Sequence, residues 1–379
     1  MGGLHGLLEP VRAPDLGGTA IRAAVEGADV NGDAVDEVIM GCVLPAGLGQ
    51  APARQASLAA GLPLATGCTT INKMCGSGMK AAMLAHDLLL AGSGQVMVAG
   101  GMESMTNAPY LLDRARGGYR LGHNTVSDHM FLDGLEDAYD KGRLMGSFAE
   151  ECADQFGFTR DAQDAFAIRS LARANQAITD GTFAREIAPV TVHGRKGDSI
   201  VEHDEQPGNA RIDKIPELKP AFRSDGTVTP ANSSSISDGA AAMVLMRRSE
   251  AERRALTPRA TILGHTTFAQ EPALFTTAPV YAIRSLLERL HWTTADVDLF
   301  EINEAFAVVT MAAMQTLDLP PDKVNVHGGA CALGHPIGAS GARIMVTLLA
   351  AMEKYDLKRG IAALCIGGGE ATAIALERA

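Results

Sequence analysis

The sequence predicts an α/β protein with a duplicated core and a long insertion between its two halves. The same order of elements occurs twice: a helix that opens on small residues, then a short apolar run that ends in glycines. Short apolar runs bounded by glycine are typical of strands buried on both faces of a sheet. Because helices alternate with such strands, we expect helices to cover the sheets.

The first copy of this unit begins at Cys75-Gly76-Ser77-Gly78, which opens a helical pattern that runs to about Ala91. The apolar run Val96-Met97-Val98-Ala99 follows and ends in Gly100-Gly101. Small residues at a helix start allow another backbone to approach closely. We therefore expect a closely packed helix followed by a buried strand.

The second copy begins at Gly338-Ala339-Ser340-Gly341, which opens a helical pattern that runs to about Tyr355. The apolar run Ile361-Ala362-Ala363-Leu364-Cys365-Ile366 follows and ends in Gly367-Gly368-Gly369. Such units recur in many α/β proteins, so chance resemblance between the halves is the alternative to duplication.

A stretch of different texture, from about Thr106 to Ser235, separates the halves. It is richer in charge, glycine and proline, and the segments 114–120 and 204–209 have the composition of surface loops. Thr159-Arg160-Asp161-Ala162-Gln163 has the spacing of a capped helix start, and apolar positions follow it. We expect a large insertion that contains helices.

Composition excludes several classes of protein. The formal net charge of -11 over 379 residues argues against sequence-independent nucleic-acid binding, which needs a positive surface. The six cysteines include no C-x-x-C pair, so no zinc knuckle, disulfide framework or other metal site is predicted. The N-terminus has no secretory signal and no segment has the apolar length of a membrane span, so we expect a cytoplasmic protein that does not bind membranes.

Two residues have the setting of a nucleophile and its base. Cys75 comes directly before a helix start, where unpaired N–H groups and the helix dipole favour thiolate over thiol. His335, in Gly334-His335-Pro336-Ile337-Gly338, precedes the second small-residue helix and is a candidate to accept the proton of Cys75. Inert packing is the alternative for the cysteine, and a solvated turn is the alternative for the histidine.

Two further residues are candidates for a site. Cys365 lies at the end of the last strong strand, directly before three glycines whose N–H groups are open to a ligand. Asn303-Glu304-Ala305-Phe306 follows an apolar and acidic stretch and starts another helix. A buried strand cysteine and a helix-capping asparagine are the simpler interpretations, and spacing alone does not decide.

Other catalytic classes lack their motifs. Gly47-Leu48-Gly49 does not continue as the dinucleotide-binding G-x-G-x-x-G pattern. The chain contains neither a G-x-S-x-G elbow nor a P-loop.

Five segments together resemble the thiolase family in their order and approximate spacing. They are Asn72-Lys73-Met74-Cys75-Gly76-Ser77-Gly78, Gly100-Gly101-Met102-Glu103-Ser104-Met105, Asn303-Glu304-Ala305-Phe306-Ala307, Gly334-His335-Pro336-Ile337-Gly338-Ala339-Ser340-Gly341 and Cys365-Ile366-Gly367-Gly368-Gly369. The likeness runs from about Gly2 to the C-terminus.

The resemblance implies the thiolase fold, a five-layered α/β/α/β/α sandwich of two similar core domains with an inserted loop domain. By this resemblance residues 1–107 plus 236–257 form the N-terminal core domain. Residues 108–235 form the CoA-binding loop domain, and residues 258–379 form the C-terminal core domain.

The resemblance also implies acetyl-CoA C-acetyltransferase activity, with CoA and acyl-CoA as substrates and no tightly bound cofactor. Cys75 would carry the acyl group after activation by His335, and Cys365 would abstract the α-proton of acetyl-CoA. His335 and a water on Asn303 would stabilise the enolate. Backbone N–H groups of Cys75 and Gly367 would meet the tetrahedral intermediate.

The same matching implies a set of binding residues. Contacts to CoA or its pantetheine arm are expected from Leu135, Ser234, Ala305 and Phe306. Walls of the acyl pocket are expected from Met145, Phe222 and Phe275. Thiolases assemble as dimers or tetramers, and the segment from Arg114 to Met130 resembles their tetramer-forming loop, so we favour a homotetramer over a homodimer.

Some positions depart from the family pattern. Leu144 replaces a common histidine, Gly208 replaces a basic residue, and Phe275 adds bulk to the acyl pocket. Arg211 or the cluster from Arg114 to Arg120 would then hold the nucleotide phosphates. The apolar first strand of thiolases is absent before Gly2-Gly3-Leu4-His5-Gly6.

We expect that missing strand to be central in the first sheet, and hence that Met1 is an internal methionine of a longer chain. Three alternatives remain beside acetyl-CoA acetyltransferase. They are a longer-chain 3-ketoacyl-CoA thiolase of fatty-acid β-oxidation, a ketosynthase or hydroxymethylglutaryl-type synthase, and a catalytically impaired acyl-CoA-binding homologue. Cys365 in its C-x-G-G-G setting disfavours the synthases.

Overall fold

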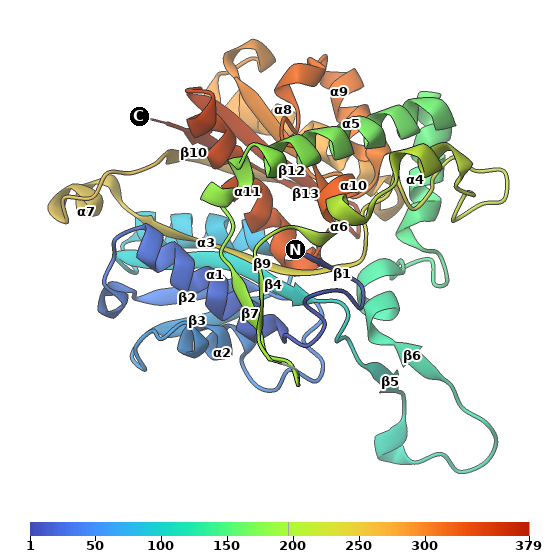
Figure 1. Ribbon diagram of the computed structural model, residues 1–379, viewed down its shortest axis with the longest axis horizontal. Coiled ribbons are helices and arrows are strands. Elements are labelled where there is room, and N and C mark those ends of the chain that lie inside the picture. Colours follow the sequence, from blue (N-terminus) through green and yellow to red (C-terminus); the bar gives the residue numbers. More distant parts are fainter. Residues whose placement is uncertain (196, 379) are drawn as a thin grey trace.

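A mixed sheet of five strands forms the core of the first half of the chain (Figure 1). The computed structural model describes residues 1–195 and 197–378. The strands of this sheet, in spatial order, are β1 (Gly2–Gly3), β9 (Ser237–Met246), β4 (Val96–Ser104), β2 (Glu37–Gly41) and β3 (Gly67–Ile71). β2 pairs in parallel with β3 and β4, whereas β9 is antiparallel to β4.

A second mixed sheet, built from the second half of the chain, repeats this plan. Its order is β10 (Thr261–Ala269), β13 (Glu370–Glu377), β12 (Arg359–Ile366) and β11 (Leu299–Ile302). β11 and β12 are parallel, and β13 is antiparallel to β12 and to β10. Since β11, β12, β13 and β10 correspond to β2, β4, β9 and β1, the expected duplication is confirmed.

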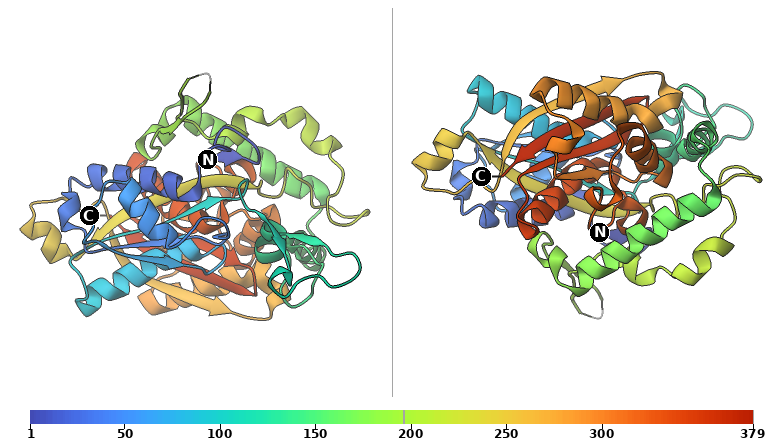
Figure 2. Two further views of the ribbon diagram at one scale, coloured as in Figure 1. Left: turned by 90° about the horizontal axis from the view of Figure 1, so that it is seen from below. Right: turned by 90° about the horizontal axis from the view of Figure 1, so that it is seen from above.

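Three layers of helices enclose the two sheets. The middle layer holds α3 (Ser77–Ala91) and α11 (Ile337–Lys354), which contact strands of both sheets. The outer face of the first sheet is covered by α1 (Ala13–Gly27) and α2 (Pro52–Ala59). The outer face of the second is covered by α8 (Ala278–Leu290) and α9 (Ala307–Leu317). The result is the five-layered α/β/α/β/α sandwich that we expected (Figure 2).

Burial on both faces explains why the strands are continuous apolar runs. Along β12, Ala362 and Leu364 pack into the cluster of the middle helices, while Ile361 and Ala363 pack against α8. Successive side chains of a strand point to opposite faces, so every position of this strand meets a hydrophobic layer.

The small residues at the helix starts let the two middle helices touch. A Cβ on Gly78 would lie 2.7 Å from the backbone nitrogen of Ala342, and one on Gly341 would lie 2.4 Å from that of Met79. Neither position has room for a side chain. This crossing brings the starts of α3 and α11, which follow Cys75 and His335, close together.

The insertion between β4 and β9 contains helices and two hairpins. β5 (Tyr110–Leu112) and β6 (Val126–Asp128) form a hairpin that projects from the body of the molecule (Figure 1). The other elements are α4 (Met145–Phe156), α5 (Arg160–Thr179), β7 (Val190–Val192), β8 (Ser199–Val201) and α6 (Glu205–Asn209). The predicted cap of α5 is confirmed, because the Thr159 side chain accepts the N–H of Ala162 at 3.2 Å.

Our expectation that the family's first strand would be central in its sheet is wrong. β1 pairs with β9 at the sheet edge, and β2 pairs directly with β4, for example Ile39 with Ala99. The centre of the sheet is therefore filled without it. β10 has the same edge position in the second sheet, where it runs over nine residues.

Two further short α-helices are α7 (Arg248–Arg253) and α10 (Ala330–Leu333). Within residues 1–195 and 197–378, none of the helices combines the length and the apolar character needed to cross a membrane.

Candidate active site

Cys75 lies in a tight turn between β3 and α3. The preceding residue, Met74, has a φ of 47°, a left-handed conformation that is uncommon outside glycine. The Ser77 hydroxyl accepts the N–H of Lys73 at 2.8 Å and donates to the carbonyl of Met74 at 2.7 Å. These bonds fix the turn and hold the sulfur at the beginning of the helix, where it retains partial solvent exposure.

Cys365 lies near the end of β12, in the other half of the chain from Cys75. It is 1% exposed, and the nearby Cys75 sulfur is one of the causes that raise the pKa of its thiol. The backbone N–H of Gly367, two residues further along, acts on Cys75 in the opposite sense and lowers its pKa. The structure therefore brings together Cys75, Cys365 and Gly367, which we had predicted to share one site.

The two thiols are protonated at neutral pH, contrary to our expectation for Cys75. Burial raises the pKa of Cys75 to about 11, although the N–H groups of Gly367 and of Cys75 itself lower it. Burial also raises the pKa of Cys365 far above its usual range. The free-energy cost of removing a thiolate from water exceeds the stabilisation that the N–H groups at the helix start provide. A base must therefore take the proton of Cys75 during the reaction.

His335 is buried and neutral rather than solvated. Its ring is 6% exposed, and burial, helped by the positive charge of Arg343, lowers its pKa to about 3. Ring Nδ1 lies 2.6 Å from the Ser340 hydroxyl, which donates its own proton to the carbonyl of Pro336 at 2.9 Å. Ser340 must therefore accept from Nδ1–H, which assigns the proton to Nδ1 and leaves a lone pair on Nε2.

Nε2 of His335 is buried and has no hydrogen-bond partner within the described part of the chain. Buried polar atoms in proteins are rarely unpaired, and exceptions are concentrated at sites that bind ligands or react. A neutral imidazole with a free lone pair is the form that accepts a proton from a thiol.

Asn303 has the same property. It follows β11, its side chain is 1% exposed, and neither polar atom of its amide has a partner among residues 1–195 and 197–378. Helix α9 begins only at Ala307 with Phe306 in the capping position, so helix capping is excluded for Asn303. Its backbone N–H donates to Ala363 of β12 at 3.0 Å, which places Asn303 beside the strand that leads to Cys365.

Apolar side chains surround the cysteines. Cys365, Phe275, Ala305 and Phe306 belong to one buried cluster, with Met145 and Phe222 packed against it. A Cβ on Gly367 would lie 3.7 Å from the sulfur of Met145. Leu135 and Cys75 both pack against a second buried cluster. The predicted acyl-pocket residues Met145, Phe222 and Phe275 thus pack in the cluster of Cys365. Leu144 directly precedes α4, which begins at Met145.

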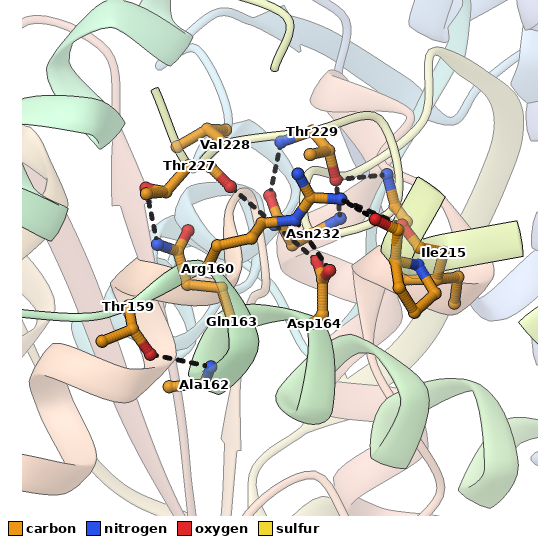
Figure 3. A network of polar contacts seen from close by, with 12 residues as sticks. Thr159, Arg160, Ala162, Gln163, Asp164, Ile215, Thr227, Val228, Thr229 and Asn232 are labelled. Atoms are coloured by element: carbon orange, nitrogen blue, oxygen red, sulfur yellow. Dashed lines mark hydrogen bonds and ion pairs between the residues drawn. The ribbon is translucent and has the colours of Figure 1, made fainter. Parts of the chain in front are cut away.

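A polar network of the insertion holds Asn232, which lies on a loop two positions before Ser234 (Figure 3). Asn232 donates to Asp164 at 3.1 Å and accepts from Thr229 at 2.7 Å, and Arg160 pairs with Asp164 at 2.7 Å. Ser234 in turn donates its hydroxyl to the carbonyl of Ala305 at 2.9 Å.

The same loop also reaches the catalytic turn, because the carbonyl of Ser235 accepts the N–H of His335 at 3.2 Å. Ser234, Ala305, Phe306 and His335 therefore meet at one place.

No described contact links the predicted phosphate-binding residues to Ser234 or His335. Arg114 is 84% exposed on the projecting β5–β6 hairpin and pairs with Asp113. Arg211 is exposed where the short helical turn Ile212–Glu217 begins. They stay predictions.

Sequence reasoning missed three residues that shape the site. Glu103 is fully buried and accepts N–H bonds from Val43 at 2.9 Å, Leu44 at 3.1 Å and Gly338 at 2.9 Å. Burial raises its pKa to about 7. Ser340 sets the His335 tautomer, and Glu370 pairs with Lys73 across the two halves. Glu103 and Ser340 are within the quoted motifs, but only three-dimensional contacts reveal what they bind.

The fold and the site define a class of protein: an enzyme with a cysteine nucleophile, a neutral histidine and a second cysteine, assembled between two halves of a duplicated α/β core. Family models for the thiolase N-terminal domain and the thiolase C-terminal domain match residues 1–249 and 256–378. The chain belongs to the thiolase family.

Individual relatives match along the whole chain. Acetyl-CoA acetyltransferase of Cupriavidus necator is 47% identical, with 100% of this chain and 96% of that protein covered. Acetyl-CoA acetyltransferase 2 of Arabidopsis thaliana is 49% identical, with 100% and 94% covered.

Two solved structures also match the fold of this protein along its whole length. The Acat5 thiolase of Ascaris suum in complex with coenzyme A superposes with a TM-score of 0.94 at 40% identity, covering 100% of this chain and 97% of that one. The acetyl-CoA acetyltransferase of Bacillus anthracis gives a TM-score of 0.96 at 39% identity, covering 100% and 96%.

Proposed function

We propose that this thiolase is an acetyl-CoA C-acetyltransferase, which condenses two molecules of acetyl-CoA to acetoacetyl-CoA and catalyses the reverse thiolysis. The observation that carries the proposal is the approach of two protonated thiols from separate halves, with Cys75 packed against the buried cluster of Ile337, two positions after the neutral, buried His335. The names of the relatives in Cupriavidus necator and Arabidopsis thaliana support the same activity.

In the first half-reaction, the Cys75 sulfur attacks the thioester carbonyl of acetyl-CoA. Nε2 of His335 accepts the thiol proton as the bond forms, so a free thiolate of Cys75 need not accumulate in the buried site. CoA leaves as its thiol after it receives the proton of Cys365, which leaves a thiolate on Cys365 and an imidazolium on His335. The product is an acetyl thioester on Cys75.

In the second half-reaction, a second acetyl-CoA loses an α-proton to the thiolate of Cys365. The resulting carbanion attacks the acetyl carbonyl on Cys75 and forms the new carbon–carbon bond. Collapse of the tetrahedral intermediate releases acetoacetyl-CoA and the Cys75 sulfur, which recovers its proton from His335. Thiolysis follows the same steps in reverse.

Both half-reactions place negative charge on an oxygen atom. We assign the enolate oxygen to His335 and to a water on the unpartnered amide of Asn303. The tetrahedral oxygen is assigned to the backbone N–H groups of Cys75 and Gly367. Each such donor contributes about 3 kcal/mol to the stabilisation of the transition state.

Bulky side chains favour a short acyl group over the longer chains of a β-oxidation thiolase. Phe275 is 3% exposed and packs edge-on against Phe148, with ring centroids 6.2 Å apart. Phe222 and Phe306 are packed similarly at 6.1 Å. CoA enters as a substrate along Leu135, Ser234, Ala305 and Phe306, and no tightly bound cofactor takes part in these steps.

Thiolysis of acetoacetyl-CoA by free CoA tests the activity, because consumption of the 3-ketoacyl thioester changes the absorbance. We expect turnover by the wild type, none above background by Cys75→Ala, and a decline along a series of longer 3-ketoacyl-CoA substrates. A folded wild type that cleaves no 3-ketoacyl-CoA contradicts the proposal, and a preference for the longest substrates favours the β-oxidation alternative.

We also propose that the protein is a homotetramer assembled through the β5–β6 hairpin. This hairpin projects from the molecule and exposes large apolar side chains, a costly arrangement for an isolated chain (Figure 1). They are Tyr110, Leu112, Tyr119, Leu121 and Val126. Contact between such hairpins of different subunits would remove this surface from water.

A further inference from the structure

Three metal-ligating side chains meet at the junction of the two core halves, outside the site described above. His86 and Asp87 lie near the end of α3, and His265 lies in the middle of β10. Asp87 Oδ1 is 3.1 Å from Nδ1 of His86 and 2.9 Å from Nε2 of His265. The candidate ligand atoms of all three residues lie within 4.8 Å of one another.

Both imidazole rings are already held in place. The His86 side chain is 20% exposed and the His265 side chain 13%, whereas the Asp87 carboxylate is 53% exposed and reachable from solvent. The rings meet edge to face, with centroids 5.2 Å apart. Holding ligands in a rigid arrangement reduces the entropy that an ion must overcome on binding.

We propose that His86, Asp87 and His265 bind a divalent transition metal ion of the zinc type. Two imidazole nitrogens and one carboxylate oxygen form a common three-ligand set for Zn²⁺, with water in the fourth position. The rings contribute Nδ1 of His86 and Nε2 of His265, which contact the Asp87 carboxylate, and on metal binding the proton of each ring moves to its other nitrogen. Ligand separations of about 3 Å to 4 Å suit a metal with bonds near 2 Å, so small side-chain shifts complete the site.

The charge around the cluster fits an ion of this type. Asp87 supplies the negative charge of the cluster, and its carboxylate already contacts a nitrogen of each ring. Lys80, also on α3, is the nearby positive charge. One carboxylate and one nearby ammonium give a moderate affinity, below that of an enclosed site with four protein ligands.

The bound ion would join the two halves. Asp87 and His265 are 178 positions apart in the sequence. Asp87 lies on α3 of the middle layer, and His265 lies on β10 of the second sheet. α3 begins next to Cys75, while the residue after β10, Gln270, donates its N–H to the carbonyl of Gly369 at 2.9 Å, four residues from Cys365. A metal at this junction would therefore stabilise the packing of the two elements that lead to the two catalytic cysteines.

The test is Zn²⁺ binding by full-length protein in which Cys75→Ala and Cys365→Ala remove the competing thiols of the active site. Binding is measured by titration calorimetry and by the change in thermal unfolding temperature. His265→Gln, His86→Gln and Asp87→Asn are compared in this background. His193→Gln is the matched control, because exposed His193 pairs with Asp198 at 2.9 Å and is not part of the three-residue cluster.

We expect one saturable site per chain and a rise in unfolding temperature with Zn²⁺ in the parent and in His193→Gln. At least a tenfold loss of affinity is expected in each of the three cluster variants. Asp87→Asn keeps the test decisive if a histidine variant fails to fold, because Asp87 is exposed. Zn²⁺ binding of equal affinity in parent and Asp87→Asn, or no saturable binding by the parent, overturns the proposal. Neither result bears on acyl transfer, which is measured with both cysteines present.

Discussion

A neutral histidine and two protonated thiols are the main chemical features of this protein at the scale of single residues. Burial raises the pKa of both cysteines and lowers that of His335, so every group is uncharged at rest. Charge then appears only while substrate occupies the site. This avoids the large cost of keeping an isolated ion in a low-dielectric interior.

Replacement of His335 tests its depressed pKa through stability. The folded-state pKa is about 3, below the ordinary 6.5, so between these values the unfolded chain binds a proton that folded His335 does not. Stability is therefore fully present above pH 6.5 and falls as pH decreases. His335→Gln should reduce the slope of unfolding free energy against pH by up to about 1.4 kcal/mol per pH unit in this window.

Urea unfolding of wild type and His335→Gln at several pH values between 7 and 4 measures both slopes. His327, whose pKa burial lowers to about 4, remains in both proteins and contributes equally. Identical slopes in the two proteins would mean that His335 titrates normally.

Asn303→Ala separates catalysis from stability. Loss of a donor that stabilises an oxyanion should lower kcat by about 100-fold to 1000-fold. Because the amide makes no hydrogen bond within the described residues, we expect the free energy of unfolding to change by no more than about 1 kcal/mol. Steady-state condensation rates and urea unfolding provide the two measurements.

Asn325→Ala is the matched control for this variant. The Asn325 amide bonds both the N–H and the carbonyl of Ile302 at 2.8 Å and also reaches Glu304 at 2.9 Å. Its loss should destabilise the fold by about 1 to 3 kcal/mol. If Asn303→Ala behaves in the same way, the Asn303 amide has a structural role instead.

Much of the residue-level site was predictable. Cys75, His335, Cys365 and Asn303 are chemically distinctive residues at the ends of predicted elements, and the family motifs select them. The charge states were not predictable, because burial depends on distant segments. The His335 tautomer is likewise set by the bond from Ser340 to Pro336, which no spacing reveals.

At the scale of elements, an ion pair joins the two loops that carry the cysteines. Lys73 precedes Cys75 by two positions, and Glu370 begins the strand that follows the Gly367–Gly369 turn. Their side chains are 19% and 33% exposed. Such a pair adds little to global stability, yet it fixes the position of one loop relative to the other.

Glu370→Gln should therefore reduce kcat by several-fold while changing the unfolding free energy by less than about 1 kcal/mol. Glu377→Gln provides the control, because Glu377 lies at the other end of β13, pairs with Arg359 at 2.9 Å and is 35% exposed. Kinetics of the two variants under identical conditions make the comparison. Equal activity of Glu370→Gln and wild type would remove the positioning role of this pair.

The helices and strands of the duplicated core were largely predictable, and their ends were less so. The small-residue starts of α3 and α11 were correctly placed to within about two residues. β4 continues through Gly100-Gly101 to Ser104, and neither glycine has room for a side chain, because β9 packs on Gly100 and α11 packs on Gly101. The edge position of β1 depends on sheet order, which the local sequence does not determine.

At the scale of the whole molecule, the active site exists only because two halves of the chain fold against each other. The same long-range assembly forms the proposed metal site from His86, Asp87 and His265, which explains why residue spacing predicted no metal ligand. In the proposed tetramer, the projecting β5–β6 hairpin forms the contacts between subunits (Figure 1).

Polar replacements on the hairpin test the proposed tetramer. Leu121 is 99% exposed and Leu112 53%, so Leu112→Ser with Leu121→Ser should leave the fold of the subunit unchanged. If these side chains are buried between subunits, we expect the tetramer to dissociate into dimers. Sedimentation velocity measures the mass of the assembly. Leu64→Ser, at a position that is 78% exposed outside the hairpin, serves as the control.

The most direct test of the central claim uses Cys365→Ser incubated with acetyl-CoA alone. Intact-protein and peptide mass spectrometry locate any acetyl group, and chromatography measures acetoacetyl-CoA. We predict one acetyl group on Cys75 and no detectable condensation product, because the first thiol still works and the second cannot take the α-proton. Undiminished formation of acetoacetyl-CoA, or the absence of an acetyl group on Cys75, would contradict the assignment of acyl transfer to Cys75 and of proton abstraction to Cys365.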